Sequence, residues 1–218
     1  MNRRKVLELI ELGESLSVEF KQRFSTHEKI AKSIISFANT CGGYLLIGID
    51  DDKSIYGIQS EKSDSELVRE TAEKYCEPPV VCNIYSYEID NSEVMVVEIP
   101  ESEFKPHRIQ DYKSKIDPNT AQVYVRVNDK SVLASKEMIK LMQTRQSNKS
   151  LVNYSVGKNE KIVFDFLEKN EKISVKELSK IANISDRRAS RTLIKLVRAN
   201  LLLIHVKENG ENYFTAVI

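Results

Sequence analysis

The 218-residue chain has 41% hydrophobic and 30% charged residues, a balance that excludes global disorder and supports packed cores. No apolar run approaches the ~20 residues that a membrane-spanning helix needs, and the basic start Arg3-Arg4-Lys5 leads into an acidic segment instead of a secretory signal. We therefore expect a cytoplasmic protein of one large domain or, more naturally, two smaller ones.

The formal net charge of +1 is unevenly distributed. Residues 158–218 contain 12 Lys/Arg against 8 Asp/Glu, whereas the rest of the chain contains 21 against 24. A basic end and an acidic front indicate two parts with different roles. The three cysteines form no C-x-x-C pair and the three histidines are scattered, so the sequence predicts neither a disulfide framework nor a Cys/His metal site.

The first third of the chain predicts alternating helices and strands. Helical spacing of apolar residues covers residues 2–12 and 28–39, and Thr26 is placed to cap the second helix. Residues 17–20 alternate as a half-buried strand does, and residues 44–49 form an apolar strand that is buried on both faces. We expect a short hairpin partner of this strand at residues 55–58.

The middle of the chain continues the mixed pattern. A helix over residues 64–75 has to end before Pro78-Pro79, and the pair Asp90-Asn91 predicts a tight turn between two strands. These and the later elements have the following ranges: strands 82–89 and 93–99, a loop over 100–119, a strand over 122–127, and a helix from Ser135 to about residue 143. Residues 144–157 lack periodicity and form the predicted linker.

The C-terminal segment predicts three helices followed by a hairpin. The helices cover residues 159–169, 174–182 and 185–199, with Ser174 and Ser185 as caps, and strands 201–206 and 213–217 follow. This order resembles the winged helix-turn-helix superfamily. The resemblance implies that the third helix lies in the major groove of DNA.

Basic residues cover one face of this third helix, opposite an apolar stripe. Those placed near its start are expected to contact bases, and the later ones and the hairpin lysine to contact phosphates. The predicted contacts are Arg187, Arg188, Arg191, Lys195, Arg198 and Lys207. The alternatives are a solvated charged face, or a module for dimerisation or protein docking. Duplex DNA is favoured over RNA because a groove-reading helix suits B-form geometry.

The N-terminal part contains two linked motifs, Gly13-Glu14-Ser15 continuing to Glu19-Phe20-Lys21, and Ala38-Asn39-Thr40 continuing to Gly42-Gly43. A strand ending in Ile47-Gly48-Ile49-Asp50-Asp51 follows them. Together they resemble the Schlafen AlbA-type domain, also labelled AlbA_2 or divergent AAA, over roughly residues 8–142. The combination is specific, although each piece alone is weak. No G-x-x-x-x-G-K-[ST] phosphate loop occurs, so the divergent AAA label does not predict ATP binding.

In Schlafen-type nucleases, acids of these motifs form a metal-dependent RNA-cleaving site. Carried over by motif, the resemblance implies Glu14, Glu19 and Asp51 as catalytic residues and ligands of Mg²⁺ or Mn²⁺, and Lys21 as a phosphate contact. Asp50 and Asp52 are alternatives to Asp51. The structural alternative is that Glu19 pairs with Lys21 or an arginine, and that the three aspartates form a turn.

We therefore predict an α/β Schlafen AlbA-like domain (1–143), a linker (144–157) and a small winged-helix domain (158–218). The predicted function is DNA binding in transcriptional regulation, without a cofactor. The alternatives are a metal-dependent endoribonuclease and a protein-interaction adaptor. A homodimer is the default, because such regulators commonly bind two half-sites and AlbA-type folds often associate. The apolar residues around the linker fit this expectation: Leu141, Met142, Leu151, Val152 and Tyr154.

Overall fold

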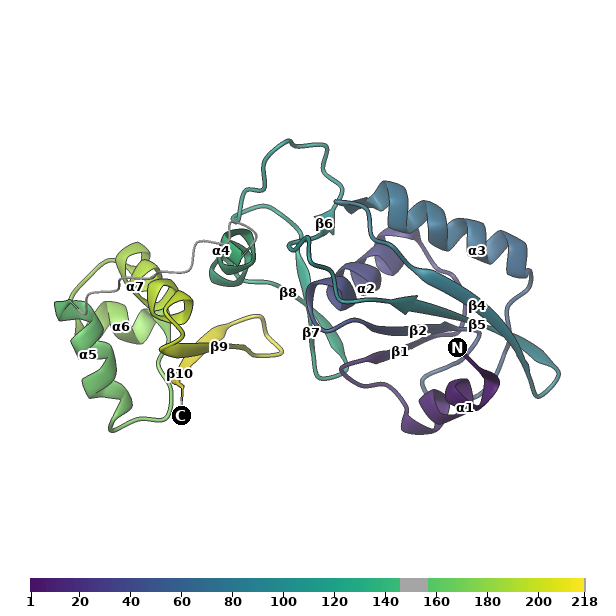
Figure 1. The fold of residues 1–218 in the computed structure, drawn as a ribbon, viewed down its shortest axis with the longest axis horizontal. Helices are drawn as coiled ribbons and strands as arrows, with labels where there is room; N and C mark the ends of the chain where they lie inside the picture. The colour runs from purple at the N-terminus through teal and green to yellow at the C-terminus, as the bar shows by residue number, and fades with distance from the viewer. Residues whose placement is uncertain (146–156, 218) are drawn as a thin grey trace. The chain divides into compact units, whose positions relative to one another are not determined.

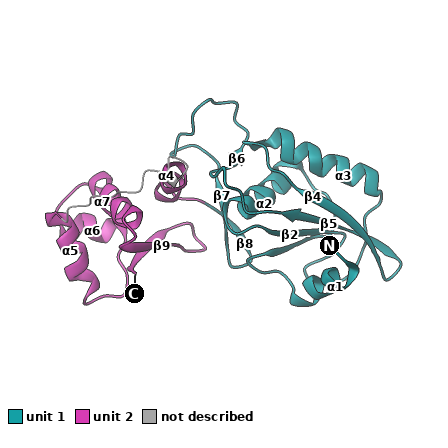
Figure 2. Ribbon diagram, viewed as in Figure 1, with its two compact units in different colours: residues 1–133 teal, residues 134–218 magenta. Residues whose placement is uncertain are grey.

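The computed structural model describes residues 1–145 and 157–217, which divide into two compact units, residues 1–133 and 134–218 (Figure 2). Each unit has its own apolar core and is described by itself. Within the described ranges, no helix combines the length and the apolar character required to cross a membrane.

The N-terminal unit is built on a mixed four-stranded sheet in the order β1-β2-β5-β4 (Figure 1). Strand β1 pairs in parallel with β2, and the remaining neighbours are antiparallel. The four strands have the bounds β1 Val18–Lys21, β2 Gly43–Ile47, β4 Asn83–Ile89 and β5 Ser92–Ile99.

Helices cover both faces of this sheet. Helix α2, His27–Asn39, lies on one face with α3, Glu61–Glu70, and with the π-helical turn Thr71–Tyr75, whereas α1, Arg3–Leu12, lies on the other face. Because side chains alternate along a strand, Leu45 packs toward α2 and Leu46 packs toward α1. This arrangement explains why β2 is apolar throughout.

Two short ribbons complete the N-terminal unit. Strand β3, Cys76–Glu77, pairs with β6, Arg108–Ile109, and β7, Tyr124–Val127, pairs with β8, Lys130–Leu133. Strand β7 packs on α2. Strand β7 and helix α2 were predicted from the sequence, whereas β3, β6 and β8 were not. Strands β3 and β6 have two residues each and pair across about 30 residues of sequence, and β8 is a four-residue strand that pairs with β7 directly before it.

One expected hairpin is wrong. Residues 55–58 do not form a strand beside β2, and a single bridge joins Ile49 to Ile55. The reason is the backbone of Gly48, which has φ 103° and whose carbonyl accepts from the N–H groups of both Tyr56 and Gly57. A side chain at Gly48 would stand 3.0 Å from Gly57, so the two chains meet in a tight crossing rather than a ladder.

The glycine pair that opens β2 is required by close packing. A Cβ at Gly43 would lie 2.4 Å from the Phe37 ring and 2.7 Å from the Ser17 carbonyl oxygen. Gly42 has φ 72°, and a Cβ there would meet the backbone of residues 99–101. Gly42 and Gly43 therefore let the chain pass from α2 into β2 with its backbone in direct contact with neighbouring residues, where a side chain would not fit.

The C-terminal unit contains helix α4, Lys136–Arg145, then helices α5–α7 and a hairpin of β9 and β10. The bounds are α5 Lys158–Leu167, α6 Val175–Ile181, α7 Asp186–Arg198, β9 Leu202–Val206 and β10 Asn212–Ala216. Their core includes Val163, Leu178, Leu193 and Phe214. Ser174 and Ser185 cap α6 and α7 as expected, and Ser174 forms a full capping box with Glu177.

Helix α4, which the sequence analysis assigned to the first domain, belongs to the C-terminal unit in the structure. The Ser190 hydroxyl of α7 donates to Glu137 at 2.7 Å, and Leu141 lies in the same apolar cluster as α5–α7. Leu141 and Met142 are buried, so neither adds to an exposed apolar surface that could support a dimer. Leu151, Val152, Tyr154 and most of the predicted linker lie outside the described residues.

Candidate functional site

Two regions of the structure contain most of the residues that were predicted from the sequence. The first is a buried polar cluster of the N-terminal unit, centred on Arg126 of β7. The second is the exposed basic face of α7 in the C-terminal unit.

The Arg126 guanidinium is fully buried and contacts several segments. Its Nη1 donates to Glu19 Oε2 at 2.6 Å, and its Nη2 donates to the carbonyl oxygens of Ser15 at 2.7 Å and Asp129 at 2.9 Å. The guanidinium carbon also lies 4.6 Å from the centre of the Phe37 ring. Burial lowers the pKa of Arg126, and the carboxylates of Glu19 and Glu14 oppose this shift.

The Glu19 carboxylate is occupied by three donors. Oε2 accepts from Arg126, and Oε1 accepts from the Ser33 hydroxyl at 2.7 Å and faces the Lys21 ammonium at 2.8 Å. Lys21 Nζ also donates to the carbonyl oxygen of Phe20 at 2.8 Å. Glu19 and Lys21, predicted as a metal ligand and a phosphate contact, are therefore joined to each other.

The other predicted acids have separate local roles. Glu14 Oε1 accepts from the backbone N–H of Phe20 at 3.0 Å, which fixes the turn before β1. Asp50 accepts from Gln22 and from the N–H of Asp51, and Asp52 accepts from the N–H of Ser54. Asp51 itself is exposed.

These contacts do not fit a metal site. Hard cations take several oxygen ligands with free lone pairs, whereas the Glu19 carboxylate is already neutralised by a guanidinium and an ammonium group. Among the described residues, no group of three or more His, Cys, Asp or Glu side chains is arranged to hold a metal ion. The metal site implied by the resemblance stays a prediction without support from these contacts.

Asn39 and Thr40 of the second motif belong to the same cluster. Asn39 Nδ2 donates to the carbonyl oxygens of His107 and Tyr124, and its Oδ1 accepts from the His107 N–H, all within 3.0 Å. The Thr40 hydroxyl accepts from the Arg126 N–H at 2.9 Å. The motif residues therefore fix β7 and the segment before β6 against α2.

Helix α7 forms the second region. Its inward face contains Ala189, Leu193 and Leu196, which are fully buried. The exposed side contains Arg187, Arg188, Arg191 and Lys195, and none of these four side chains forms an ion pair within the part of the chain that the structure describes. The periodicity of an α-helix thus separates the apolar stripe from the cationic one.

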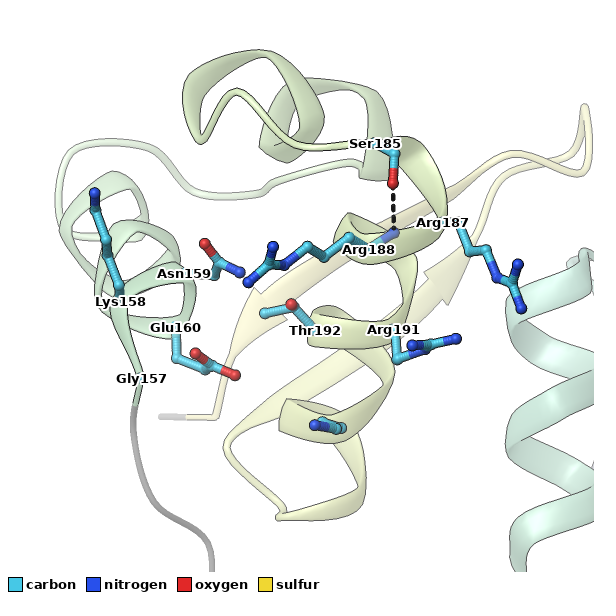
Figure 3. A pocket seen from close by; sticks show the side chains of 10 residues that line it. Gly157, Lys158, Asn159, Glu160, Ser185, Arg187, Arg188, Arg191 and Thr192 are labelled. Carbon is cyan, nitrogen blue, oxygen red and sulfur yellow. Dashed lines mark hydrogen bonds between the residues drawn. The ribbon is translucent and has the colours of Figure 1, made fainter.

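A hollow of ≈ 820 Å³ lies between this cationic face and the start of α5. Figure 3 shows Arg188 extending from α7 toward Asn159, whereas Arg187 and Arg191 point to the other side of the helix. The lining includes five cations against one acid, Glu160: Lys158, Arg187, Arg188, Arg191 and Lys195. The N-terminus of α5 has no side-chain cap and adds the positive end of a helix dipole.

The remaining predicted contacts are less open. Arg198 lies in the last turn of α7 and is half-buried. Lys207, in the turn between β9 and β10, forms an exposed ion pair of 3.6 Å with Glu211. The hydrogen bond from Asn209 and the charge of Lys207 lower the pKa of the Glu211 carboxyl. The six basic contacts predicted in the C-terminal part thus lie on α7 or on this turn, whereas Lys21, the seventh, is paired with Glu19 in the other unit.

The sequence analysis missed two kinds of residue. Arg126 was placed on a strand but given no role, although an arginine inside an otherwise apolar strand is a signal of a buried partner. Lys158 and Asn159 were not selected, because only the packing of α5 beside α7 brings them to the hollow.

The sequence model of a family described as "Schlafen, AlbA_2" matches residues 14–135, more than half of the chain. The N-terminal domain of a Nitrosomonas europaea protein, described as related to the ATP-dependent DNA helicase RecG, is 22% identical; the match covers 50% of this chain and 81% of that chain, with a TM-score of 0.40.

A protein from Corynebacterium diphtheriae, known from a crystal structure, has 15% sequence identity to this chain, and the two structures superpose with a TM-score of 0.51. The match covers 93% of this chain and 46% of that chain. The similarity is one of fold, and the chain spans less than half of that protein's length.

Proposed function

Because the chain belongs to the Schlafen AlbA_2 family, we propose that it is a nucleic-acid-binding protein and, more specifically, a DNA-binding transcriptional regulator. The observation that supports this most directly is the exposed cationic face of α7. Phosphate neutralisation by Lys and Arg supplies most of the affinity of proteins for duplex DNA.

We propose that α5–α7 with β9 and β10 form a winged helix-turn-helix. Helix α6 ends at Ile181, α7 begins at Asp186, and the two helices pack on each other, as the two helices of such a motif do. The β9–β10 hairpin takes the place of the wing. In this geometry, α7 enters the major groove with its N-terminal residues toward the bases.

The positions of the cations along α7 suggest their roles. Arg187, Arg188 and Arg191 lie in its first half, where base edges are contacted, whereas Lys195 lies further along and is placed for phosphates. Lys158 and the uncapped start of α5 add a phosphate contact from a second helix. Duplex DNA is preferred to RNA in this proposal, because a side chain cannot reach base edges in the narrow major groove of A-form RNA.

We also propose a homodimer, because two-fold symmetric binding of half-sites is the usual way in which such helices gain affinity. Sedimentation at micromolar concentration would give about twice the 25.0 kDa chain mass if it forms. A 25.0 kDa particle at all concentrations would contradict the dimer.

The alternative of a metal-dependent endoribonuclease receives no support from the contacts of Glu14, Glu19 and Asp51. The experiment that separates it from the regulator is incubation of structured RNA with Mn²⁺ or Mg²⁺, with the Glu19→Gln variant beside the parent. We expect no cleavage that depends on Glu19. Metal-dependent cutting that stops in the variant, with folding retained, would establish the enzyme.

The proposal is tested by selecting duplexes from a random-sequence pool and titrating the best one with wild-type and variant protein. The variant Arg187→Ala/Arg191→Ala should bind more weakly by about 1–3 kcal/mol per lost base contact. Its circular dichroism spectrum should not change, because both side chains are exposed.

The matched control is Lys161→Ala/Lys169→Ala, which removes the same charge from exposed positions on or beside α5. We expect this control to lose much less affinity than the α7 variant. Equal losses in the two variants would mean that only the total charge matters, and unchanged binding in the α7 variant would refute its role in recognition.

A further inference from the structure

Tyr112 is an exposed aromatic residue on a strained turn of the N-terminal unit. It lies in the segment between β6 and β7, which extends as a loop in Figure 1, and the residue is 90% exposed. Its φ angle is 56°, in the left-handed region that L-residues rarely adopt. Tyr112 therefore contributes little to the core, although its backbone conformation is unfavourable.

Other residues hold such positions with less strain. Of the seven non-glycine residues with positive φ among the described residues, four are Asn and one is Asp, and Tyr112 is the only aromatic one. Asn and Asp tolerate this conformation through local hydrogen bonds of their short side chains. Neither packing nor backbone geometry accounts for a tyrosine at this position. Strain that the surrounding structure maintains is a recognised feature of binding sites.

Hydrogen bonds hold the backbone of this turn in place. The Tyr112 N–H donates to Gln110 Oε1 at 2.7 Å, and Gln110 Nε2 donates to Glu77 Oε2 at 2.7 Å. The buried Arg108 side chain donates to Asp111 Oδ1 at 3.1 Å and to the carbonyl oxygen of Lys113 at 2.5 Å. The tyrosine is thus presented on a pre-organised scaffold, which lowers the entropic cost of binding.

The charges around Tyr112 indicate the kind of partner. Two lysines, Lys113 and Lys115, follow Tyr112, and the acid before it, Asp111, is bound by the buried Arg108. Both lysines are exposed, and the Lys113 ammonium forms a long ion pair of 3.7 Å with Asp111 Oδ2. The residues next to Tyr112 in the chain, Asp111, Lys113 and Ser114, are polar.

We propose that the segment from Arg108 to Lys115 is a contact for single-stranded nucleic acid, in which Tyr112 stacks on an unpaired base and Lys113 and Lys115 meet the neighbouring phosphates. An aromatic ring beside basic side chains is the combination that single strands require. This inference rests on the proposed nucleic-acid function, and it adds a contact in the other unit for a different form of the ligand.

The test is the affinity of the full chain for a fluorescent oligothymidylate of about 12 nucleotides, a length within the usual site size of single-strand binders. Tyr112→Ala should weaken binding about 5-fold to 150-fold, the range expected for the loss of one stacked base. Tyr112→Phe should stay close to wild type, because the ring is retained. Tyr112→Gly should lose as much as Tyr112→Ala while keeping the positive φ without strain.

The matched control is Tyr56→Ala, which removes another exposed tyrosine of the same unit and should leave the affinity unchanged. Unchanged oligothymidylate affinity in Tyr112→Ala, or no binding by the wild type, would overturn the inference. Duplex affinity separates this result from the proposed function. In the proposed function, the affinity for duplex DNA depends on Arg187 and Arg191, so Tyr112→Ala should leave the duplex affinity unchanged.

Discussion

Arg126 joins parts of the N-terminal unit that are far apart in the sequence. Its partner Glu19 is 107 residues away, and its other contacts include the carbonyl oxygen of Ser15. Removing one member of a buried ion pair leaves a charge without compensation in a low-dielectric surrounding. The burial of the motif residue Glu19 beside Arg126 is thus accounted for by its contribution to stability.

We expect Arg126→Met to lower the free energy of unfolding by about 3–5 kcal/mol, because the buried Glu19 carboxylate would lose its guanidinium partner and keep only the contacts with Lys21 and the Ser33 hydroxyl among those described. Urea unfolding followed by circular dichroism measures this change. Arg69→Met, a substitution of the same type in the last turn of α3, should change it by less than about 0.5 kcal/mol. A similar small effect at Arg126 would show that the buried pair contributes little.

His107 links stability to pH. It is 2% exposed, and its ring nitrogens lie 2.7 Å from the Pro78 carbonyl oxygen and 2.6 Å from the Ser102 hydroxyl. Burial lowers the pKa of His107 below its ordinary value of 6.5. On acidification, the unfolded chain therefore binds the proton at a higher pH than the folded chain does. The stabilisation is fully present above the unfolded-state pKa of the histidine, and it is lost as the pH falls through the folded-state pKa.

The free energy of unfolding of the N-terminal unit should therefore decrease from pH 7 to about pH 5, before most carboxylates titrate. His107→Gln should be less stable at pH 7 but nearly independent of pH in this window. His205→Gln, in the other unit, should retain the dependence. A pH-independent wild type between these values would contradict the role of His107.

At the scale of elements, turns and helix caps were predicted from the sequence, whereas strands that pair with distant segments were not. The Asp90-Asn91 turn between β4 and β5 was predicted, and both residues have the positive φ that such a turn requires. The caps of α2, α6 and α7 were also predicted, because each depends on residues within one turn. Strands β3 and β6 were missed, since each has two residues and pairs with a strand about 30 residues away in the sequence.

The capping box of α6 gives a prediction at this scale. Ser174 accepts from the Glu177 N–H, and Glu177 accepts in return from the Ser174 N–H at 2.7 Å. Ser174→Ala should lower the stability of the C-terminal unit by about 1 kcal/mol, and differential scanning calorimetry measures the shift. Ser114→Ala, at an exposed loop position of the other unit, should leave it unchanged. No shift in Ser174→Ala would show that α6 is held by packing alone.

At the scale of the whole molecule, the family of the N-terminal part and the basic face of α7 were predicted from the sequence, whereas the contacts of the predicted acidic residues were not. The family resemblance of the N-terminal part was confirmed, and the basic stripe of α7 followed from helical spacing alone. The environment of Glu19 could not be predicted in the same way, because its carboxylate is bound by an arginine from a strand more than a hundred residues later. Such long-range pairs leave no periodic signal in one sequence.

The dependence of duplex affinity on salt concentration tests the central proposal most directly, because it counts the cations that meet phosphates. Plotted as log affinity against log salt between about 50 and 200 mM, the wild type should fall with a slope near −0.9 for each phosphate contact. Lys195→Ala should flatten this slope by about 0.9, whereas Lys169→Ala should leave it unchanged. A wild-type slope near zero, or the same slope in Lys195→Ala, would contradict the binding of DNA by the basic face of α7.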